Sequence, residues 1–267
     1  MHGRYIYPFL GSLNLDVACF VRNTLRNSSK LDLSQDMKAS IKVFHKVHLV
    51  FEKQDLITLP LSKFYKIKLQ DLIPAFSTKE DYLVIIDTVK DDEKDFGYFP
   101  QEHQITYETT NFQRATVLYD QQPAFPRKGK YSPILVLAPK IWVGDDINSY
   151  VIFSPFREEC DKNIQDNPLE IQLLDEQGKV ILKHSEKIAL NSIYVFDVKK
   201  YLGKNVTEKQ RFYNLVSKSG DAIYSIFTII RNERTGNIAI EHSLPPGYYA
   251  SGDKVKIRDE ALRLAAQ

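Results

Sequence analysis

The sequence predicts an all-β protein of two tandem sandwiches, immunoglobulin-like or jelly-roll-like, that arose by internal duplication. Its dominant local pattern is alternation of apolar and polar residues with a period of two, rich in β-branched and aromatic side chains, which is typical of half-buried strands. Amphipathic helical stripes are nearly absent. Of the 267 residues 43% are hydrophobic, and adding the 11 glycines gives about 47%, a usual share for a globular chain. The length suits two domains or one large all-β domain.

Fourteen short strands are expected at fairly regular spacing, which favours sandwiches or barrels over alternating strands and helices. They cover residues 15–22, 40–51, 64–69, 82–89, 104–109, 115–119, 134–137, 149–153, 169–174, 180–184, 193–198, 211–217, 222–231 and 237–242. The only expected helix is short and covers residues 258–266, where Ala261, Leu262 and Ala265 can share one face.

Three local patterns recur about 130 residues apart and indicate the duplication. They pair residues 41–44 with 171–174, 61–69 with 190–198, and 96–103 with 235–242. The offset is 130 for the first pair, 129 for the second and 139 for the third. A single insertion of ten residues in the second copy, between residues 203 and 221, accounts for the change in offset.

The predicted domain boundaries follow from this repeat. The first sandwich is expected over residues 1–120 and the second over residues 147–250. Residues 121–146 form a linker packed between the copies, because residues 122–130 contain two prolines, which favour extended structure. Residues 251–267 form a C-terminal tail that carries the short helix.

Charge and hydropathy exclude several classes of partner. The formal net charge is +2 with no block of like charges, so nucleic acid is not expected to bind. No apolar window is long enough to span a membrane. The first 20 residues lack the continuous apolar region of a signal peptide, because Pro8, Asn14 and Asp16 interrupt them. These features predict a cytoplasmic protein.

The two cysteines are expected to be free thiols, since two in a chain of this length make no disulfide framework. Cys19 lies in an apolar strand-like run and should be buried and unreactive. Cys160 lies among acidic residues, which suppress its thiolate, and should be accessible.

Motifs for cofactor chemistry are missing from the sequence. It contains no glycine-rich phosphate loop, no dinucleotide fingerprint, no nucleophile elbow and none of the strong zinc signatures. No cofactor is therefore expected.

The histidines nearest to a functional pattern are His103 and His242, because each follows a glutamate at the end of a repeated segment. A Glu-His dipeptide in a strand directs its two side chains to opposite faces, so one copy provides a single ligand. A metal or acid–base site would need Glu102, His103, Glu241 and His242 from both copies. The competing interpretation is that each ring closes the end of its sandwich with a hydrogen bond.

Aromatic residues near the ends of the copies leave a similar choice between carbohydrate binding and core packing. They are Tyr107, Phe112, Tyr119, Tyr248 and Tyr249. Packing is favoured for the loop around Tyr248 and Tyr249, since the edges of an all-β surface need to be covered.

These observations favour a non-catalytic binding or interaction protein whose partner is a protein or a small ligand. The alternative is an enzyme with a metal or acid–base site at the junction of the two copies. A homo-oligomer or a subunit of a larger assembly also remains open.

Overall fold

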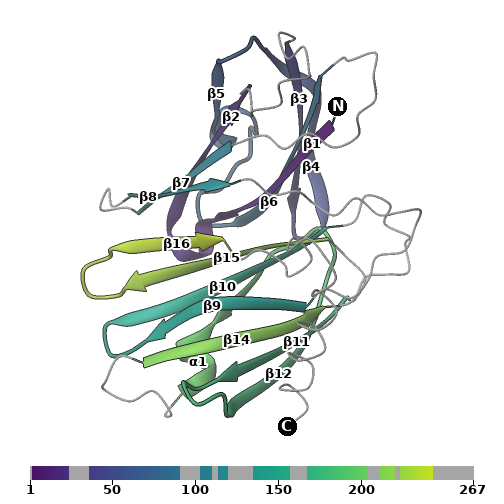
Figure 1. The fold of residues 1–267 in the computed structure, drawn as a ribbon. Coiled ribbons are helices and arrows are strands. Elements are labelled where there is room, and N and C mark those ends of the chain that lie inside the picture. Colours follow the sequence, from purple (N-terminus) through teal and green to yellow (C-terminus); the bar gives the residue numbers. More distant parts are fainter. Residues whose placement is uncertain are drawn as a thin grey trace, which may run out of the picture. The chain divides into compact units, whose positions relative to one another are not determined.

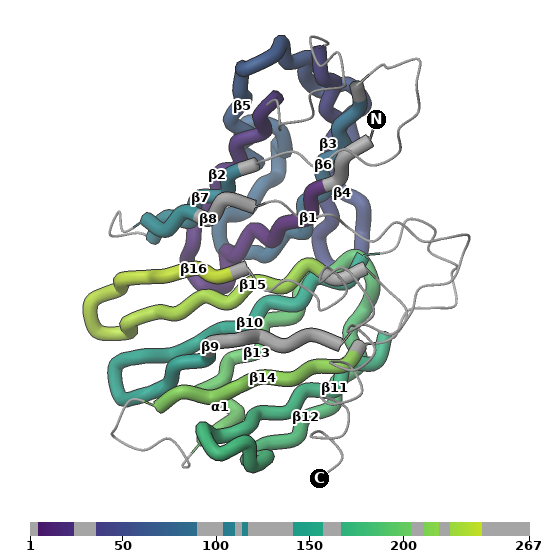
Figure 2. Tube along the Cα trace, viewed as in Figure 1, coloured from purple at the N-terminus to yellow at the C-terminus, as the bar shows by residue number. Residues whose placement is uncertain are grey.

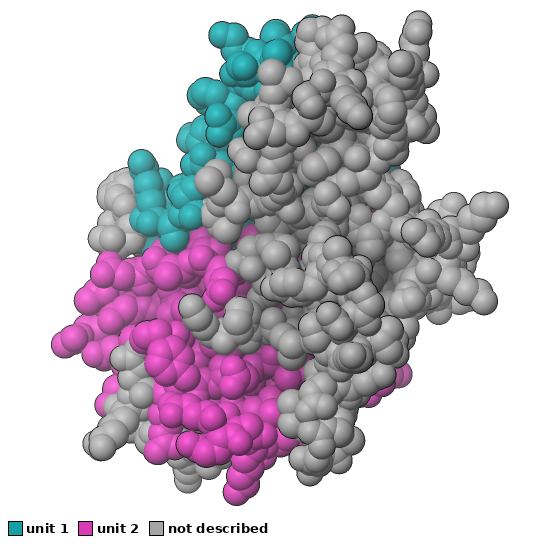
Figure 3. Space-filling model, in the orientation of Figure 1, with its two compact units in different colours: residues 1–124 teal, residues 125–267 magenta. Residues whose placement is uncertain are grey.

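The computed structural model describes residues 2–23, 36–90, 103–109, 114–119, 135–156, 167–203, 211–219 and 223–242. Most of these residues lie in antiparallel strands (Figure 1), so the predicted all-β class is confirmed. The chain divides into unit 1, Met1–Ala124, and unit 2, Phe125–Gln267, which Figure 3 colours separately. The helix expected over residues 258–266 lies outside the described residues.

Unit 1 contains eight strands in two sheets. The strands are β1 (His2–Leu10), β2 (Leu15–Arg22), β3 (Met37–His45), β4 (His48–Leu59), β5 (Phe64–Ile67), β6 (Asp81–Lys90), β7 (His103–Thr109) and β8 (Arg114–Tyr119), with 3-10 turns η1 (Gly11–Leu13) and η2 (Leu69–Asp71). One sheet has the order β1-β6-β3-β4 and the other the order β5-β2-β7-β8.

Unit 2 also contains eight strands in two sheets. They are β9 (Leu135–Val143), β10 (Ile147–Phe156), β11 (Asn167–Leu174), β12 (Val180–Ile188), β13 (Tyr194–Asp197), β14 (Arg211–Ser219), β15 (Ile223–Asn232) and β16 (Ile238–His242), with helix α1 (Val198–Leu202) after β13. The sheet orders are β12-β11-β14-β9 and β13-β10-β15-β16.

The two units have the same topology, which confirms the predicted duplication. When eight is added to each strand number of unit 1, its two sheet orders become those of unit 2, the first of them read in reverse. The strands can be followed in Figure 2. Ile41 and Ile171, matched by sequence, occupy the equivalent strands β3 and β11 and are both buried in the core.

The third sequence match is wrong. His103 is the first residue of β7, whose counterpart is β15, whereas His242 is the last residue of β16, whose counterpart is β8. The insertion is also misplaced, because β6 and β7 are joined by residues 91–102 while β14 and β15 are joined only by residues 220–222. The longer connection therefore belongs to unit 1. Alternating strands resemble one another at any even shift, so matching one strand to its neighbour carries little penalty in the pattern.

Strand β1 is not among the strands predicted from the sequence. Residues 5–10 are all buried, so the apolar–polar alternation that marks other strands is absent. Pro8 also argues against a strand, but β1 lies at the edge of its sheet, where a missing N–H group is tolerated.

The expected strand over residues 40–51 is two strands joined by a tight turn. His45 pairs with His48 across Lys46 and Val47, whose φ angles are 46° and 70°. Such turns usually carry Gly or Asn, and their absence here hides the hairpin in the sequence.

The linker expected over residues 121–146 also differs from the structure. Leu135–Val143 forms β9, which pairs with β14 and is therefore part of unit 2. Strand β10 begins at Ile147, so the strands of unit 2 start before the residue predicted for the second sandwich.

A side chain–backbone hydrogen bond joins the two sheets of unit 1. The hydroxyl of Tyr107, on β7, donates to the Pro8 carbonyl on β1 over 2.7 Å, and Tyr107 is completely buried. In unit 2 the space between the two sheets is filled by an apolar cluster that includes Val151, Phe153 and Ile171. Both units thus have an interior between their sheets, as sandwiches require.

Close packing of Gly11 against the start of β6 leaves no room for a side chain. A Cβ at Gly11 would meet the carbonyl oxygen of Glu80, lie 2.6 Å from that of Thr78 and 2.7 Å from the Glu80 nitrogen. All three are backbone atoms, so the clash requires movement of the chain.

We expect Gly11→Ala to destabilise the protein by about 3 kcal/mol, because overpacking against backbone cannot relax through side chains. Gly178→Ala is the matched control, since Gly178 has a φ of 80° but a Cβ added there would have no neighbouring atom within 4 Å. Its cost should be about 1 kcal/mol from backbone strain alone. Calorimetric melting measures the stability of both variants. Equal stability would contradict the predicted clash at Gly11.

Candidate functional site

The predicted metal or acid–base residues are not equivalent in the two units. Glu102 lies outside the described residues. The backbone of His103 pairs with Val21 and Tyr119, while Glu241 pairs with Thr228 and His242 pairs with Phe227. The premise that both histidines end matched strands is therefore incorrect, and the metal site itself stays a prediction. Within the described ranges no three His, Cys, Asp or Glu residues form a group that could hold a metal ion.

We expect purified protein prepared without chelator to contain no stoichiometric metal. Replacing His103 and His242 together by Gln should leave the metal content unchanged and cost about 1 kcal/mol per lost neutral hydrogen bond. Elemental analysis measures the first quantity and urea unfolding the second. Retention of about one metal per chain that the double variant loses would restore the enzyme hypothesis.

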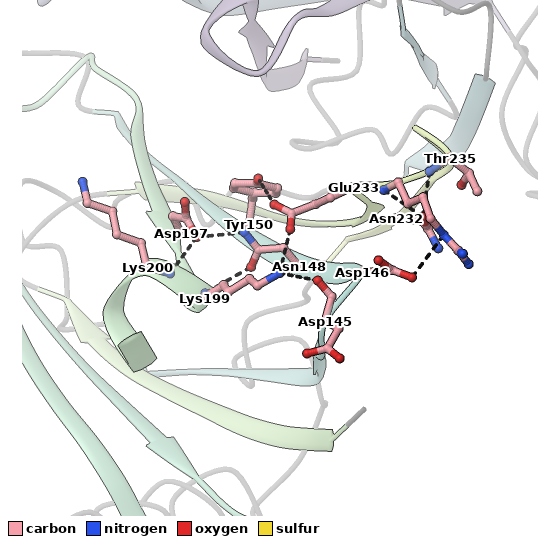
Figure 4. A network of polar contacts seen from close by, with 11 residues as sticks. Asp145, Asp146, Asn148, Tyr150, Asp197, Lys199, Lys200, Asn232, Glu233 and Thr235 are labelled. Atoms are coloured by element: carbon pink, nitrogen blue, oxygen red, sulfur yellow. Dashed lines mark hydrogen bonds and ion pairs between the residues drawn. The ribbon is translucent and has the colours of Figure 1, made fainter. Parts of the chain in front are cut away.

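The densest polar network in the described residues lies in unit 2, where the β9–β10 and β15–β16 turns meet the start of α1 (Figure 4). The Lys199 ammonium donates to Glu233 Oε2 over 2.7 Å and to the Asp145 carbonyl over 2.6 Å. Buried Asn148 donates through Nδ2 to Asp197 Oδ1 and accepts from the Lys199 backbone N–H. This network joins three segments and pairs the Lys199 ammonium with the Glu233 carboxylate.

Two further contacts extend the network towards solvent. Tyr150 donates to Glu233 Oε1 over 3.4 Å, and burial raises the pKa of that tyrosine. Arg234 Nε lies 3.2 Å from Asp146 Oδ2. The side chain of Asn232 accepts from the backbone N–H groups of Arg234 and Thr235 and so shapes the β15–β16 turn. These contacts stabilise the turn conformations.

A second polar group in unit 2 is a chain of two tyrosines and a histidine. His184 Nε2 lies 3.0 Å from the Tyr194 hydroxyl, which lies 3.0 Å from the Tyr201 hydroxyl. The Tyr201 ring stacks on Phe196, with centroids 4.5 Å apart. Burial and the neighbouring Tyr201 raise the pKa of Tyr194. The chain closes the edge of the core between β12, β13 and α1, with His184 in the middle of β12.

In unit 1, the Glu80 carboxylate contacts two side chains at the end of the β3–β4 hairpin. Its Oε2 lies 3.2 Å from His45 Nε2 and 3.1 Å from Lys46 Nζ, and these two partners lower the pKa of the glutamate. Neighbouring Asp81 accepts from both the backbone and the hydroxyl of Ser12, while burial raises its pKa. The serine hydroxyl is therefore engaged by the carboxylate, and His45 by Glu80, which is no arrangement for activating a nucleophile.

Cys19 is buried between the sheets of unit 1, as predicted. The Tyr7 hydroxyl hydrogen-bonds to its sulfur, and burial raises the pKa of the thiol far above its ordinary value. Cys160 lies outside the described residues.

The Cys160→Ser variant should therefore resist a thiol reagent such as DTNB until it is unfolded, because Cys19 is inaccessible and protonated. The matched Cys19→Ala variant should react at once through Cys160. Fast reaction of native Cys160→Ser would contradict the buried, protonated thiol.

The outward face of sheet β5-β2-β7-β8, which we call the open face, is the candidate site. Its aromatic edge consists of Phe64, which is 63% exposed, and the half-buried Phe20, whose ring centroid lies 6.2 Å away. Lys66 Nζ lies over the Phe20 ring, 5.5 Å from its centroid. Cross-strand pairing fixes this order, because Phe20 lies opposite Lys66 and Arg22 opposite Phe64.

Beside the aromatic edge, the open face carries polar residues together with Ala18 and Leu118. Gln104 lies opposite Phe20, and Thr106 lies between Ala18 and Thr116. The hydroxyl oxygens of Thr106 and Thr116 are 3.0 Å apart. These side chains form a row of hydroxyl and amide groups beside the aromatic edge.

The last row of the open face is charged. Asp16 lies opposite Glu108, and Glu108 opposite Arg114. Arg114 donates to both oxygens of Glu108, over 2.7 and 3.2 Å.

The aromatic residues proposed from the sequence as carbohydrate-binding candidates are not those of the open face. Tyr107 is a core residue, and Phe112, Tyr248 and Tyr249 lie outside the described residues. For Tyr119 only the backbone, in β8, is described. The available signal was the dipeptide Phe64-Tyr65, because adjacent aromatic residues in a strand point to opposite faces.

Comparison with known proteins shows no family. No family model matches the chain, and no curated protein matches it. Solved structures that resemble it include a β-glucuronidase from Bacteroides uniformis (9% identity, 90% of this chain and 26% of that chain, TM-score 0.20). A glycosyl hydrolase family 2 member from Bacteroides cellulosilyticus shows 11% identity and a TM-score of 0.20, and the matched region covers 91% of this chain and 28% of that chain.

A third similar structure is A223, a turret protein of Sulfolobus turreted icosahedral virus, with 9% identity, coverage of 85% of this chain and 97% of that chain, and a TM-score of 0.15. This chain spans about a quarter of the two glycosidases. At these TM-scores the similarities carry no functional argument. Among the described residues, no helix has the length and apolar character needed to cross a membrane.

Proposed function

We propose that this chain is a non-catalytic binding or interaction protein that contacts its partner through unit 1. The observation that carries the proposal is the distribution of exposed large hydrophobic side chains. Of six such side chains among the described residues, five lie in unit 1: Val47, Leu49, Val50, Phe64 and Tyr65. Exposed apolar groups that cluster are typical of interaction sites.

The sixth exposed hydrophobic, Phe212 in unit 2, has an internal partner. Its ring packs edge-on against Trp142, with centroids 4.1 Å apart. Four of the unit 1 residues instead form two groups, the β3–β4 hairpin end with Val47, Leu49 and Val50, and the Phe64 edge of the open face, while Tyr65 follows Phe64 in β5. Leu49 lies on the paired strand β4 and Phe64 on the paired strand β5, so a partner meets an ordered surface at both groups.

The polar side chains that could take part in catalysis support the same proposal. Lys199, Glu80 and His184 each contact a side chain of the protein itself. The enzyme alternative depended on matched strand ends, and that match does not hold in the topology.

The proposal is tested by immobilising the full chain and measuring capture of macromolecules from an extract of the cells that produce it. Two variants change unit 1, Leu49→Ser/Val50→Ser and Phe64→Ser, and Phe212→Ser is the control in unit 2. We expect at least one unit 1 variant to lose about tenfold in affinity, typical of removing an interface anchor, while the control binds as wild type. Equal capture by all four proteins would refute the proposal.

A further inference from the structure

We propose that the open face of unit 1 binds a neutral carbohydrate chain, with Phe64 stacking on a sugar ring and the polar rows hydrogen-bonding its hydroxyls. This inference rests on the proposed binding function and specifies its ligand class and site. Four features of the described residues support it.

The first feature is an aromatic ring presented to solvent on a rigid support. Phe64 is 63% exposed although it lies in a paired strand, and its ring lies against Phe20. Because Lys66 covers the Phe20 ring, Phe64 is the ring left available for stacking. The C–H groups on one face of a pyranose are apolar, and an exposed aromatic ring is their usual complement. Little ordering is needed on binding, which limits the entropic cost.

The second feature is the placement of hydrogen-bonding groups next to that ring. Gln104 lies across from Phe20, and its amide nitrogen lies 3.5 Å from the Thr106 hydroxyl, which contacts Thr116. Amides and hydroxyls donate and accept at once, as sugar hydroxyls do. Ala18 lies opposite Thr106 and has the smallest side chain on the outward side of β2, so it leaves room beside the threonine hydroxyls.

The third feature is the charge balance. The face carries Arg22, Lys66 and Arg114 against Asp16 and Glu108. Arg114 and Glu108 neutralise each other through two contacts. A ligand held by phosphate or sulfate groups would require a clear excess of positive charge. The balance favours an uncharged polar ligand.

The fourth feature is the contrast with the duplicate. Cys19 pairs with Ile67 and Val151 pairs with Phe196, and these pairings make Phe20 equivalent to Ile152. By the same register, Gln104 is equivalent to Phe227 and Thr106 to Ile229. In unit 2 all three positions are apolar and buried, so that face serves packing. At these equivalent positions unit 1 carries an aromatic and polar set, Phe20, Gln104 and Thr106.

The test is affinity electrophoresis of the full chain through gels that contain one polysaccharide each. The neutral probes are hydroxyethyl cellulose, xylan, galactomannan and yeast mannan, and heparin is the polyanion. Wild type should be retarded by at least one neutral polysaccharide, and 0.5 M NaCl should not abolish the retardation, since screening weakens only charged contacts.

Phe64→Ala should weaken the association constant about tenfold, the loss expected on removing one stacking ring. Phe212→Ala is the matched control, because it removes an exposed aromatic ring from unit 2, and it should bind as wild type. Circular dichroism of each variant establishes that the fold is retained. Thr106→Val, which keeps the shape and removes the hydroxyl, should give a smaller loss.

Three results would overturn the inference: no retardation by any neutral probe, retardation that Phe64→Ala leaves unchanged, or retardation only by heparin that salt abolishes. If extract capture depends on unit 1 but neutral polysaccharides do not bind, the ligand is a macromolecule of another class and only this inference fails. If capture is also independent of unit 1, the proposed function fails with it.

Discussion

The alternation of side chains along β2 is the constraint on which both the interior and the open face of unit 1 depend. Successive residues of a strand point to opposite faces. The odd-numbered residues, such as Val17 and Cys19, are therefore buried against the other sheet, while the even-numbered ones, such as Phe20, point outward. Since β2 pairs with both β5 and β7, its register also decides which residues of those strands share each face. A one-residue slip would exchange core and surface together.

The same constraint explains how the two units can differ in the surface they present without differing in fold. In β10 the inward residues Val151 and Phe153 belong to the core cluster, as their counterparts do in β2. The outward residue Ile152 is also fully buried, which makes β10 a strand with no solvent-facing side near its centre. Side chains at outward positions contribute little to the core between the two sheets. They are therefore free to become a packing surface in one unit and a polar, aromatic surface in the other.

The strand content could be predicted from the sequence because period-two alternation reports a half-buried strand directly, and the duplication because residues 41–44 and 171–174 share a pattern and lie in equivalent strands. The prediction failed where the strand is not half-buried or the turn is not marked. Residues 5–10 of β1 are buried throughout, and the turn at Lys46 and Val47 lacks Gly and Asn. The predicted site failed for a related reason, since Glu-His dipeptides were matched by local pattern while strand pairing separates β7 from β16. The open face could not be predicted, because it consists of residues from four strands whose neighbours are set only by pairing.

The position of the polar groups separates those that maintain the fold from those that remain open to a ligand. Lys199, Asn148 and Asp197 join loops and hold one another at hydrogen-bond distance, so removing one partner leaves another buried group unsatisfied. Gln104, Thr106 and Thr116 instead lie on the outside of a sheet that the backbone ladder already holds together. Their hydroxyl and amide groups are not needed for strand pairing, and the apolar residues at the equivalent positions of unit 2 demonstrate that the fold forms without them. A polar, aromatic set that the fold does not require, held on strands that the fold does require, is a rigid surface suited to recognition.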